Sequence, residues 1–512
     1  MASNWLFQRV IDTPPGDLVI FGLGAVTLYA SFRYIYYVHF HPASGFPGPR
    51  LAAISNIWYA YHWVTGKYPW AVAEALKKYG DVVRVAPNEL AFITPRAFSD
   101  IYDSHTSGQE HFPKTNFMDL GLGDDGLSWE RNPAKHHADA KKLAPAFSMK
   151  SMKAKESTMH KYTDAFVQRM KNFGGREDGI ELKTWTDWVA MDASADLAYS
   201  REMHHLRDMK STSFLDELWV VNFFVTANQI FKKFPLLSPI RWLFVPPSIL
   251  ASYYKVQRMN QEALESRIAR RGNTEHLDHF EQLLPVNAPA PTREEQKHIE
   301  VITGHLVIAG YEPIASQIFC TIMFSLLEPQ NLKLLVEEIR AEFKSYEDIH
   351  ADALGTLRFL NASLMETLRI TVLSSNGMPR ASPGTMVDGN YIARGVEVQY
   401  GVLAFTRSPR YFHDPHRYRP QRWLPEDHPH WDPVFKDDAR EDFHPFSLGP
   451  RSCPGMPMAW RQTRLFIAKV LWTFDVEMLP NQSIVFERDF RMYGMWEKPK
   501  FWVRFHSVPR DS

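Results

Sequence analysis

The chain has little cysteine and no excess of either charge. Cysteine occurs twice in 512 residues, so it cannot build a disulfide framework. Lysine plus arginine and aspartate plus glutamate each total 58, which leaves no overall basic field to favour nucleic acid. Internal repeats and low-complexity tracts are also missing from the sequence. These features exclude a disulfide-stapled secreted scaffold, a nucleic-acid-binding protein and a repeat array.

Apolar and aromatic residues, in contrast, are plentiful. A hydrophobic share of 45%, with 34 Phe, 20 Tyr and 15 Trp, is enough for a sizeable core. Apolar positions at helical spacing dominate the middle of the chain, and short alternating runs occur on either side of it. We therefore predict a mainly helical fold with a small β region, and a mobile surface loop at the proline-containing segment 273–295. The predicted elements are helices at 68–79, 293–326, 332–343 and 357–370, and hairpins at 81–93 and 387–392.

An apolar run near the N-terminus predicts a membrane anchor. The run at 18–32 is followed by Arg33 and three tyrosines, and its extension to Val38 gives ~20 residues, the length that spans a bilayer. A cleaved signal peptide is the alternative, but interfacial tyrosines favour the anchor. Two arginines follow the run and one precedes it, which favours a cytosolic C-terminal part. The segment 46–50, Phe-Pro-Gly-Pro-Arg, cannot continue a helix and is either a plain linker or a stiff hinge.

The most informative motif surrounds Cys453. Residues 446–455 read Phe-Ser-Leu-Gly-Pro-Arg-Ser-Cys-Pro-Gly. A cysteine thiolate is a strong axial ligand for haem iron, and backbone N–H groups of a tight turn can stabilise its charge. Gly449 and Gly455 allow close backbone approach, Arg451 can meet a haem propionate, and Phe446 can pack under the ring. The alternative is a buried free cysteine in a Gly/Pro loop.

This run resembles the Phe-x-x-Gly-x-Arg-x-Cys-x-Gly haem loop of the cytochrome P-450 family, and all five fixed positions match. The resemblance implies haem b with Cys453 as its axial thiolate ligand. With Cys453 holding iron, Cys320 has no partner, which points to a reducing compartment. The resemblance also implies one large, mostly helical domain behind the membrane anchor.

A charged trio supports the resemblance. Glu366 and Arg369 are spaced to share one helix face, which by itself predicts no more than a weak surface salt bridge. The pair resembles the Glu-x-x-Arg of the family's K helix, and Pro-Gln-Arg-Trp at 420–423 resembles the later segment that adds a second arginine, here Arg422. The resemblance implies a buried trio whose loss would be severe.

Further cations match the family's propionate contacts. Arg380 stands where the family often places a propionate arginine. His137 and Lys141 resemble its Trp/His-x-x-x-Arg element, with lysine in place of arginine. Lysine provides a point charge without the bidentate fork, so we expect a less specific contact. For Lys141 and its neighbour Lys142 the alternative is a solvated helix face.

The central helix departs from the family pattern. Residues 309–314 read Ala-Gly-Tyr-Glu-Pro-Ile, where the family usually has an acid followed by threonine. The acid is present as Glu312, after Gly310, but Pro313 replaces the alcohol that relays protons to dioxygen. Proline lacks an N–H and predicts a kink. Proton delivery would then need water, Ser316 or a hydroxyl of the substrate, or else chemistry that depends less on the relay. A packing variant without mechanistic meaning is the alternative.

Two motifs are rejected. The glycines at 121–126 spell G-x-G-x-x-G, but two aspartates would repel a pyrophosphate and Pro133 interrupts a following helix. We interpret the segment as a flexible loop, which by position matches the family's loop over the substrate pocket. The pairs His276/His279 and His204/His205 lack further ligands at zinc-like spacing, so packing or solvated roles are expected.

These observations lead to one functional hypothesis. The resemblance implies a haem monooxygenase that receives electrons from NADPH-cytochrome P-450 reductase and oxidises a small apolar molecule by hydroxylation, desaturation or rearrangement. The sequence is similar to fungal members of secondary metabolism, anchored in the endoplasmic reticulum membrane with a cytosolic catalytic domain. The alternatives are a haem-thiolate isomerase or dehydratase, and a haem sensor or carrier. The expected segments are a leader at 1–17, the anchor at 18–38, a hinge at 39–50 and the catalytic domain at 51–512.

Overall fold

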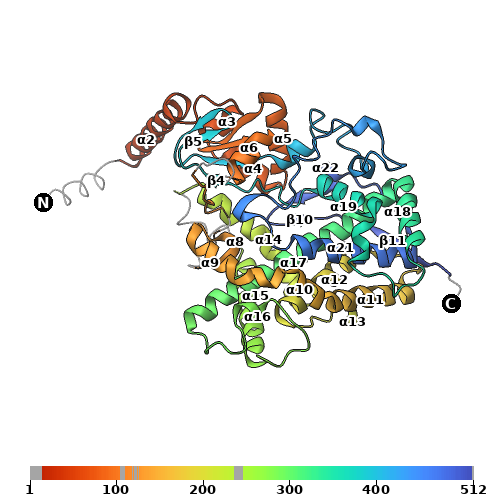
Figure 1. The fold of residues 1–512 in the computed structure, drawn as a ribbon. Helices are drawn as coiled ribbons and strands as arrows, with labels where there is room; N and C mark the ends of the chain where they lie inside the picture. Colours follow the sequence, from red (N-terminus) through yellow and green to blue (C-terminus); the bar gives the residue numbers. More distant parts are fainter. Residues whose placement is uncertain are drawn as a thin grey trace.

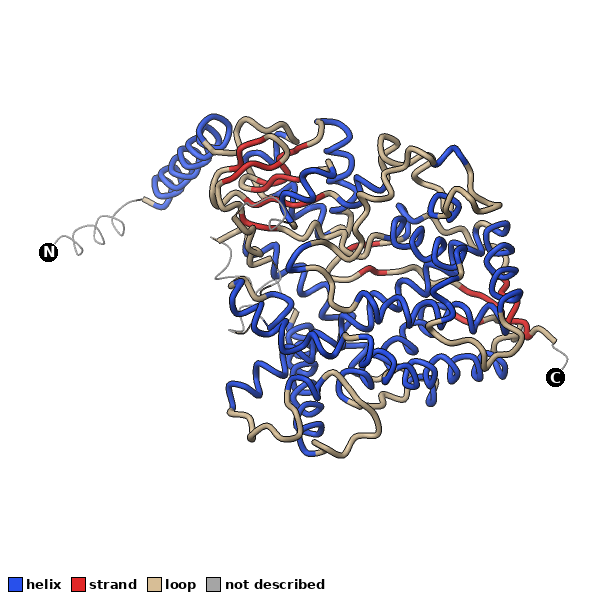
Figure 2. The backbone as a smooth tube through the Cα atoms, viewed as in Figure 1, coloured by secondary structure: helices blue, strands red, loops and turns tan. Residues whose placement is uncertain are grey.

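The structure is a computed structural model that describes residues 14–103, 110–117, 119, 124, 126–235 and 246–509. Most of the predicted leader at 1–17 lies outside these residues, as do most positions of the glycine-containing loop at 121–126. Figure 2 shows that helices make up most of the body and that strands are few. The mainly helical fold with a small β region is confirmed.

A long apolar helix stands apart from the body near the N-terminus (Figure 1). α2 (Pro15–Ile35) continues directly into a π-helical turn, η1 (Tyr36–Phe40). The span Val19–Phe40 is long and apolar enough to cross a bilayer, and none of its apolar window is buried in the protein. Among the described helices, α17 (Arg293–Leu327) also meets these criteria, but it is mostly buried. The N-terminal helix is therefore a candidate membrane span.

The Pro-rich segment after this helix is docked on the body. Arg84 is buried, and its Nη1 donates a hydrogen bond to the Tyr37 carbonyl oxygen over 2.8 Å. The Arg84 backbone N–H bonds to the Pro47 carbonyl oxygen at 2.7 Å. A Cβ on Gly48 would lie 2.4 Å from the Arg84 carbonyl oxygen, so only glycine fits this close approach. The segment thus fixes where the helix leaves the body.

The strands of the described residues form four small sheets: a mixed four-stranded sheet, the three-stranded sheet of β3 (Ile180–Glu181), β11 (Trp502–Ser507) and β8 (Phe474–Met478), the pair β10 (Trp496–Glu497) and β9 (Arg491–Met492), and a separate hairpin. β1 (Val82–Ala86) and β2 (Glu89–Phe92) form the hairpin predicted at 81–93. β2 pairs in parallel with β7 (Glu397–Tyr400), and β4 (Arg380–Ala381) completes the sheet in the order β1-β2-β7-β4. The second predicted hairpin is also confirmed, as β5 (Thr385–Val387) and β6 (Asn390–Ile392).

The helical core is centred on α17. Its N-terminus carries a complete capping box between Thr292 and Glu295, which fixes where the helix begins. Apolar residues surround most of its length, as expected for a helix buried on all sides. α17 packs against α12 (Leu182–Tyr199) and α21 (Met456–Thr473), and α21 in turn packs against α11 (Glu156–Phe173). The central helix predicted at 293–326 is therefore confirmed.

The remaining helical predictions also hold, but one loop prediction does not. α5 (Tyr68–Tyr79), α18 (Pro329–Glu342) and α19 (Arg358–Thr371) match the predicted segments closely. The surface loop predicted at 273–295 is wrong for its middle part. Asp278 there is fully buried and pairs with Arg267 on the preceding helix at 2.6 Å. Such an ion pair produces no periodic pattern of apolar residues, so the sequence alone predicts a loop for this segment.

The other described elements connect these layers. The long segment between β7 and α21 contains only single helical turns, and one of them precedes Cys453. The bounds are α3 (Arg50–Ile54), α4 (Ile57–Val64), α6 (Pro95–Tyr102), α8 (Gly126–Trp129), α9 (Pro133–Leu143), η2 (Ala144–Phe147), α10 (Met149–Ala154), β3 (Ile180–Glu181), α13 (His205–Asp208), α14 (Ser213–Lys232), α15 (Pro247–Ala269), α16 (Phe280–Leu283), η4 (Ala353–Thr356), α20 (Val402–Thr406), η5 (Pro420–Trp423), η6 (Pro433–Phe435), η7 (Gly449–Arg451), β8 (Phe474–Met478), α22 (Phe486–Asp489), β9 (Arg491–Met492), β10 (Trp496–Glu497) and β11 (Trp502–Ser507).

Candidate functional site

The cysteine-bearing turn is closed by its own backbone. The Cys453 N–H donates to the Phe446 carbonyl oxygen at 2.8 Å, and the turn η7 lies between them. Gly449 has a φ of +66°, and a Cβ there would lie 2.3 Å from the Tyr102 carbonyl oxygen. Both the left-handed backbone and the close approach require glycine, as the sequence predicted. The turn is therefore fixed against the end of α6.

The Cys453 thiol lies at the start of α21. Protein atoms surround it on most sides, and this burial raises the pKa of the thiol. Backbone N–H groups of Gly455 and Met456 point to Sγ and oppose the rise, because they favour the thiolate. The side chain nevertheless remains accessible. Cys320, in contrast, is buried within α17. Two backbone N–H groups thus favour the thiolate form of Cys453. A bound metal cation would favour that form further and deprotonate the thiol.

The expected close approach at Gly455 is not to the protein's own atoms and stays a prediction for the haem. Gly455 has an ordinary φ of −80°, and a Cβ there would lie 3.7 Å from Cys453 Sγ, which is normal contact. The protein's own atoms therefore do not require glycine at this position. Phe446 packs against Trp460 of α21, with ring centroids 6.0 Å apart. It also borders an apolar pocket between α17, α19 and α21, which is lined by Pro313, Ile314, Gln317, Leu368, Leu373, Phe446, Ala459, Trp460 and Thr463.

A cluster of buried cations lies beside the turn. Both terminal nitrogens of Arg451 are buried and have no hydrogen-bond partner among the described residues. Arg380 in β4 is 5% exposed, and its backbone pairs with that of Lys114 in an isolated β-bridge. Burial, Arg380 and Arg451 lower the pKa of Lys114 to about 7. Positive charge is thus concentrated here, and Glu130 is the carboxylate that partly offsets it at Arg451.

The cluster fits the carboxylates of a haem. Burial and Arg380 also lower the pKa of Arg451, to about 10. Burying like charges together is unfavourable unless an anion joins them. Two propionates would supply the missing negative charges and accept from the orphaned guanidinium nitrogens. Arg380 and Arg451, both predicted from the sequence, therefore meet at one place.

The histidine on α9 that lies nearest this cluster is not the predicted one. His136 is half-buried, and burial, Arg451 and Lys114 lower its pKa to about 4. His137 and Lys141 are exposed on the same helix, and their contacts with haem stay a prediction. Adjacent helix positions point about 100° apart, so a shift of one residue in the matched motif changes which side chain faces the cluster.

The charged trio is assembled as predicted. Glu366, Arg369 and Arg422 are all fully buried. Arg369 donates to both oxygens of Glu366, through Nε at 2.8 Å and Nη2 at 2.7 Å. Arg422 Nε reaches Glu366 Oε1 at 3.1 Å, and Trp423 Nε1 donates to Oε2 at 2.8 Å. Desolvation would raise the pKa of Glu366, but the two arginines hold it down to about 2.

In α17 the residues of the predicted acid–alcohol region point in different directions. A Cβ on Gly310 would lie 2.5 Å from Ser194 Oγ of α12, so close helix packing explains this glycine. Glu312 is 7% exposed, and its Oε1 accepts a hydrogen bond from Ser316 Oγ at 2.8 Å. Burial raises the pKa of Glu312, although Lys498 opposes the shift. Pro313 lies within the helix and lines the pocket beside Phe446.

Several contacts were not predicted from the sequence. Lys114, His136 and Lys498 lie in segments without a matching motif, and the fold alone brings them to the site. Trp423 carried a signal, since it ends the Pro-Gln-Arg-Trp match. Among the described residues no group of three or more His, Cys, Asp and Glu side chains forms a metal site. The suspected histidines have packing or pairing roles, such as His276 with Asp196 at 2.7 Å and buried His205 with Asp192.

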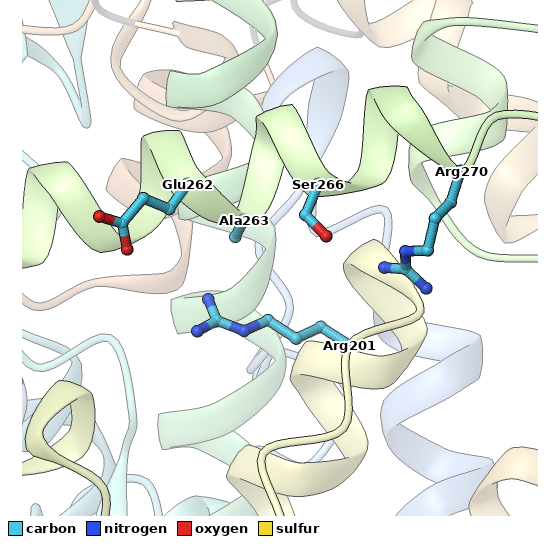
Figure 3. A pocket seen from close by; sticks show the side chains of 5 residues that line it. All are labelled: Arg201, Glu262, Ala263, Ser266 and Arg270. Carbon is cyan, nitrogen blue, oxygen red and sulfur yellow. The ribbon is translucent and has the colours of Figure 1, made fainter.

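Another pocket lies between α15 and the segment that follows α12, and it is separate from the residues described above (Figure 3). Arg201 and Arg270 face it together with Glu262 and Ser266. The Arg270 guanidinium already donates to the backbone carbonyls of Ser200 and Tyr199. The pocket shares no residue with the cysteine turn, the cationic cluster or the trio.

Comparison with known proteins agrees with this geometry. The family model for cytochrome P-450 matches residues 47–503. The chain is 48% identical to cytochrome P-450 monooxygenase TwmD of Talaromyces wortmannii, covering 97% of this chain and 98% of that protein. It is 33% identical to cytochrome P-450 monooxygenase poxC of Penicillium oxalicum, covering 94% and 93%. Identity to cytochrome P-450 monooxygenase BOA3 of Botryotinia fuckeliana is 32%, covering 95% and 96%. The chain therefore belongs to the cytochrome P-450 family of monooxygenases, whose cofactor is haem b with an axial cysteine thiolate.

Proposed function

We propose that Cys453 is the axial ligand of the haem and that Arg380, Arg451, Lys114 and His136 surround its propionates. The observation that carries this proposal is the buried cationic cluster beside the cysteine turn, in which both terminal nitrogens of Arg451 lack hydrogen-bond partners among the described residues. Haem b, when bound, supplies the activation of dioxygen. The chain's own contribution is to hold the cofactor, stabilise the thiolate through the two backbone N–H groups and present an apolar pocket.

The ligand assignment is tested by the spectrum of the reduced carbon monoxide complex. The wild-type protein should show the red-shifted Soret band of thiolate-ligated haem, and Cys453→Ser should abolish that band. Cys320→Ser is the matched control, because Cys320 is buried in α17, and it should keep the band. A normal band in Cys453→Ser would show that another residue holds the iron.

The substrate we propose is a small apolar metabolite of fungal secondary metabolism, which the enzyme hydroxylates, desaturates or oxidatively rearranges. The likeness to fungal cytochrome P-450 monooxygenases supports this substrate class. The apolar pocket at Pro313 and Phe446 lies on the cysteine side and would hold the haem ring itself. The experiment measures NADPH and dioxygen consumed per product. One equivalent of each is expected for a hydroxylation. Product formed without either would instead support a haem-thiolate isomerase or dehydratase.

Within α17 we propose that Glu312 donates protons from its carboxyl group and that Pro313 shapes the groove beside the haem. Gly310 contributes by allowing α12 to approach. Pro313→Thr restores a backbone N–H and adds a methyl and a hydroxyl, so it should lower product formation or change the product distribution. Glu312→Ala should slow turnover. A higher rate and better coupling in Pro313→Thr would show that the native site is merely impaired.

For location and electron supply we propose that α2 and η1 anchor the enzyme in the endoplasmic reticulum membrane, with a cytosolic catalytic domain reduced by NADPH-cytochrome P-450 reductase. The proposed segments are a leader at 1–17, the anchor at 18–38, a hinge at 39–50 and the catalytic domain at 51–512. Deleting the chain through Val38 should weaken binding to microsomes yet keep the carbon monoxide spectrum, because the anchor lies outside the core. Glycosylated or secreted protein would support a signal peptide instead.

A further inference from the structure

Glu312 is one end of a chain of buried polar contacts that leads away from the apolar pocket. Its Oε1 accepts from Ser316 Oγ at 2.8 Å, one helical turn further along α17. Ser316 in turn lies 3.4 Å from Lys498 Nζ, which donates to it. Ser316 is 1% exposed and Lys498 is 4% exposed, so water from the surface does not reach these groups directly.

The series of polar contacts continues from Lys498 to the surface of the protein. Lys498 Nζ pairs with Asp187 Oδ1 of α12 at 3.1 Å. The other oxygen of Asp187 pairs with Lys183 Nζ at 2.9 Å, on the same helix. The side chain of Lys183 is 21% exposed and lies over the ring of Trp219 at 4.6 Å. Lys183 is thus the member of the chain that touches solvent.

The hydrogen bonds in this series of contacts are ordered from donor to acceptor, as a proton route requires. Lys498 donates to both Asp187 and Ser316, and Ser316 donates to Glu312. Each link joins a proton donor to an acceptor that can itself donate after protonation. Moreover, the alcohol that usually follows the acid is replaced here by Pro313, so Ser316 is the hydroxyl that contacts Glu312. The backbone N–H of Trp496 also donates to the Glu312 carboxyl group and holds it toward β10.

We propose that Ser316, Lys498, Asp187 and Lys183 form the route by which Glu312 regains a proton from solvent after each donation. This inference rests on the proposed role of Glu312 as proton donor. When Glu312 has lost its proton, the O–H proton of Ser316 passes to Glu312 Oε1 while an N–H proton of Lys498 passes to Ser316 Oγ. Asp187 carries the replacement from Lys183 to Lys498, and Lys183 takes one proton from water. One proton therefore enters for each that leaves, without an added oxidant or reductant.

A purely structural role would predict different behaviour. The buried pair Lys498–Asp187 also links the segment between β10 and β11 to α12, so its loss would cost stability in either case. A proton route predicts in addition a change in the isotope effect of D2O on turnover and in the product formed per NADPH. Lys469 offers a matched control, because it is a buried lysine paired with Asp164 at 2.7 Å and stands in α21 outside the chain of contacts.

The experiment compares Ser316→Ala, Lys498→Met and Lys183→Met with Lys469→Met, all as full-length holoenzyme. The carbon monoxide spectrum is recorded first, and it should stay normal in Ser316→Ala and Lys183→Met. With the natural substrate, Ser316→Ala and Lys498→Met should form on the order of 10-fold or more less product per NADPH and show a larger D2O isotope effect. Lys183→Met should show a smaller change of the same sign, because Ser316, Lys498 and Asp187 remain in place, and Lys469→Met should show none.

The outcomes separate the route from the function it serves. If Ser316→Ala forms as much product per NADPH as wild type and shows the same D2O isotope effect, the proposed route is wrong. The carbon monoxide spectrum and the turnover would still support the monooxygenase. A slow Glu312→Ala enzyme together with an unaffected Ser316→Ala enzyme would mean that Glu312 is reprotonated from elsewhere. If Lys498→Met fails to bind haem, Ser316→Ala and Lys183→Met still test the route. Both should fold, because every buried charge keeps at least one partner in them. Unimpaired Glu312→Ala would instead contradict the proposed role of Glu312.

Discussion

Two groups of buried arginines in this enzyme differ in their counter-charges. Arg369 and Arg422 share the carboxylate of Glu366, and Arg422 also pairs with the buried carboxylate of Asp438. Nη1 of Arg369 donates to the backbone carbonyls of Thr406 and Pro415. Arg451, in contrast, has two buried nitrogens without a partner among the described residues. The positive charges of the first group are balanced and hydrogen-bonded within the protein. Those of the second group need an added anion. A balanced group of charges thus indicates a structural role, and an unbalanced one indicates a ligand site.

The largest effect is expected from breaking the balanced group. Glu366→Ala leaves the fully buried Arg369 without a carboxylate and leaves Arg422 with Asp438 alone, and the free energy of unfolding should fall by ~3–5 kcal/mol. Loss of haem incorporation should follow, because η5 and the segment leading to the cysteine turn depend on these contacts. Urea unfolding and the carbon monoxide spectrum measure both effects.

Asp178→Ala is the control for this variant. The Arg176–Asp178 pair is a salt bridge of the same type, but both side chains are largely exposed, so its loss should be nearly neutral. A well-folded, haem-loaded Glu366→Ala protein would refute the structural role of the trio.

The opposite result is expected from the unbalanced group. Arg451→Met removes no hydrogen bond from the terminal nitrogens in the haem-free protein, so its unfolding free energy should not fall. Haem affinity should fall by ~1.5–3 kcal/mol, the range for hydrogen bonds to charged groups. Haem transfer to apomyoglobin and urea unfolding of the haem-free protein measure the two quantities separately.

Arg340→Met provides the reverse case. Arg340 donates to the carbonyls of Leu471 and Phe474, so the same substitution should cost stability while leaving haem affinity unchanged. If Arg451→Met destabilised the haem-free protein as much as Arg340→Met does, Arg451 would belong to a balanced group after all.

The sequence predicts one of these groups better than the other. The trio could be predicted because Glu366 and Arg369 share one helix face and Arg422 stands in a recognisable segment. The cationic cluster could be predicted only in part. Arg380 and Arg451 lie in matched motifs, but Lys114 reaches the cluster through a β-bridge to Arg380 that no local pattern encodes. His136 was not predicted, because the family match falls on its neighbour His137, whose side chain points to another face of α9 and whose haem contact stays a prediction.

The same reasoning explains the results in α17. The helix itself could be predicted from its length and apolar pattern, and Glu312 from its place before Pro313. The contacts that lead from Glu312 through Ser316 and Lys498 to Asp187 join three elements far apart in the sequence. Ser316 was recognised as a possible substitute for the missing alcohol, because it lies one turn away. Lys498 carried no sequence signal, since its position depends on how the segment after β10 packs against α12.

The smallest expected effect, and the finest test of the comparison, is the pH dependence of stability. Burial, Arg380 and Arg451 lower the pKa of Lys114 from 10.5 to about 7 in the folded protein. Between these values the unfolded chain binds a proton that the folded chain has lost, so the free energy of unfolding should rise as pH increases from about 7 toward 10.5. Glu366 acts in another window, because its pKa is lowered from 4.5 to about 2. Its contribution is complete above pH 4.5 and is lost as pH falls toward 2.

Urea unfolding of the haem-free protein across the neutral-to-alkaline range checks this prediction. The difference between wild type and Lys114→Met should grow with pH in favour of wild type, because the variant lacks the titrating group. In the haem-loaded protein the propionates would favour protonated Lys114 and flatten that difference. Lys469→Met serves as the control, since Lys469 is buried but already paired with Asp164 at 2.7 Å. Equal slopes for wild type and Lys114→Met in the haem-free protein would show that the cluster is balanced without haem, and the distinction between the two groups of charges would fail.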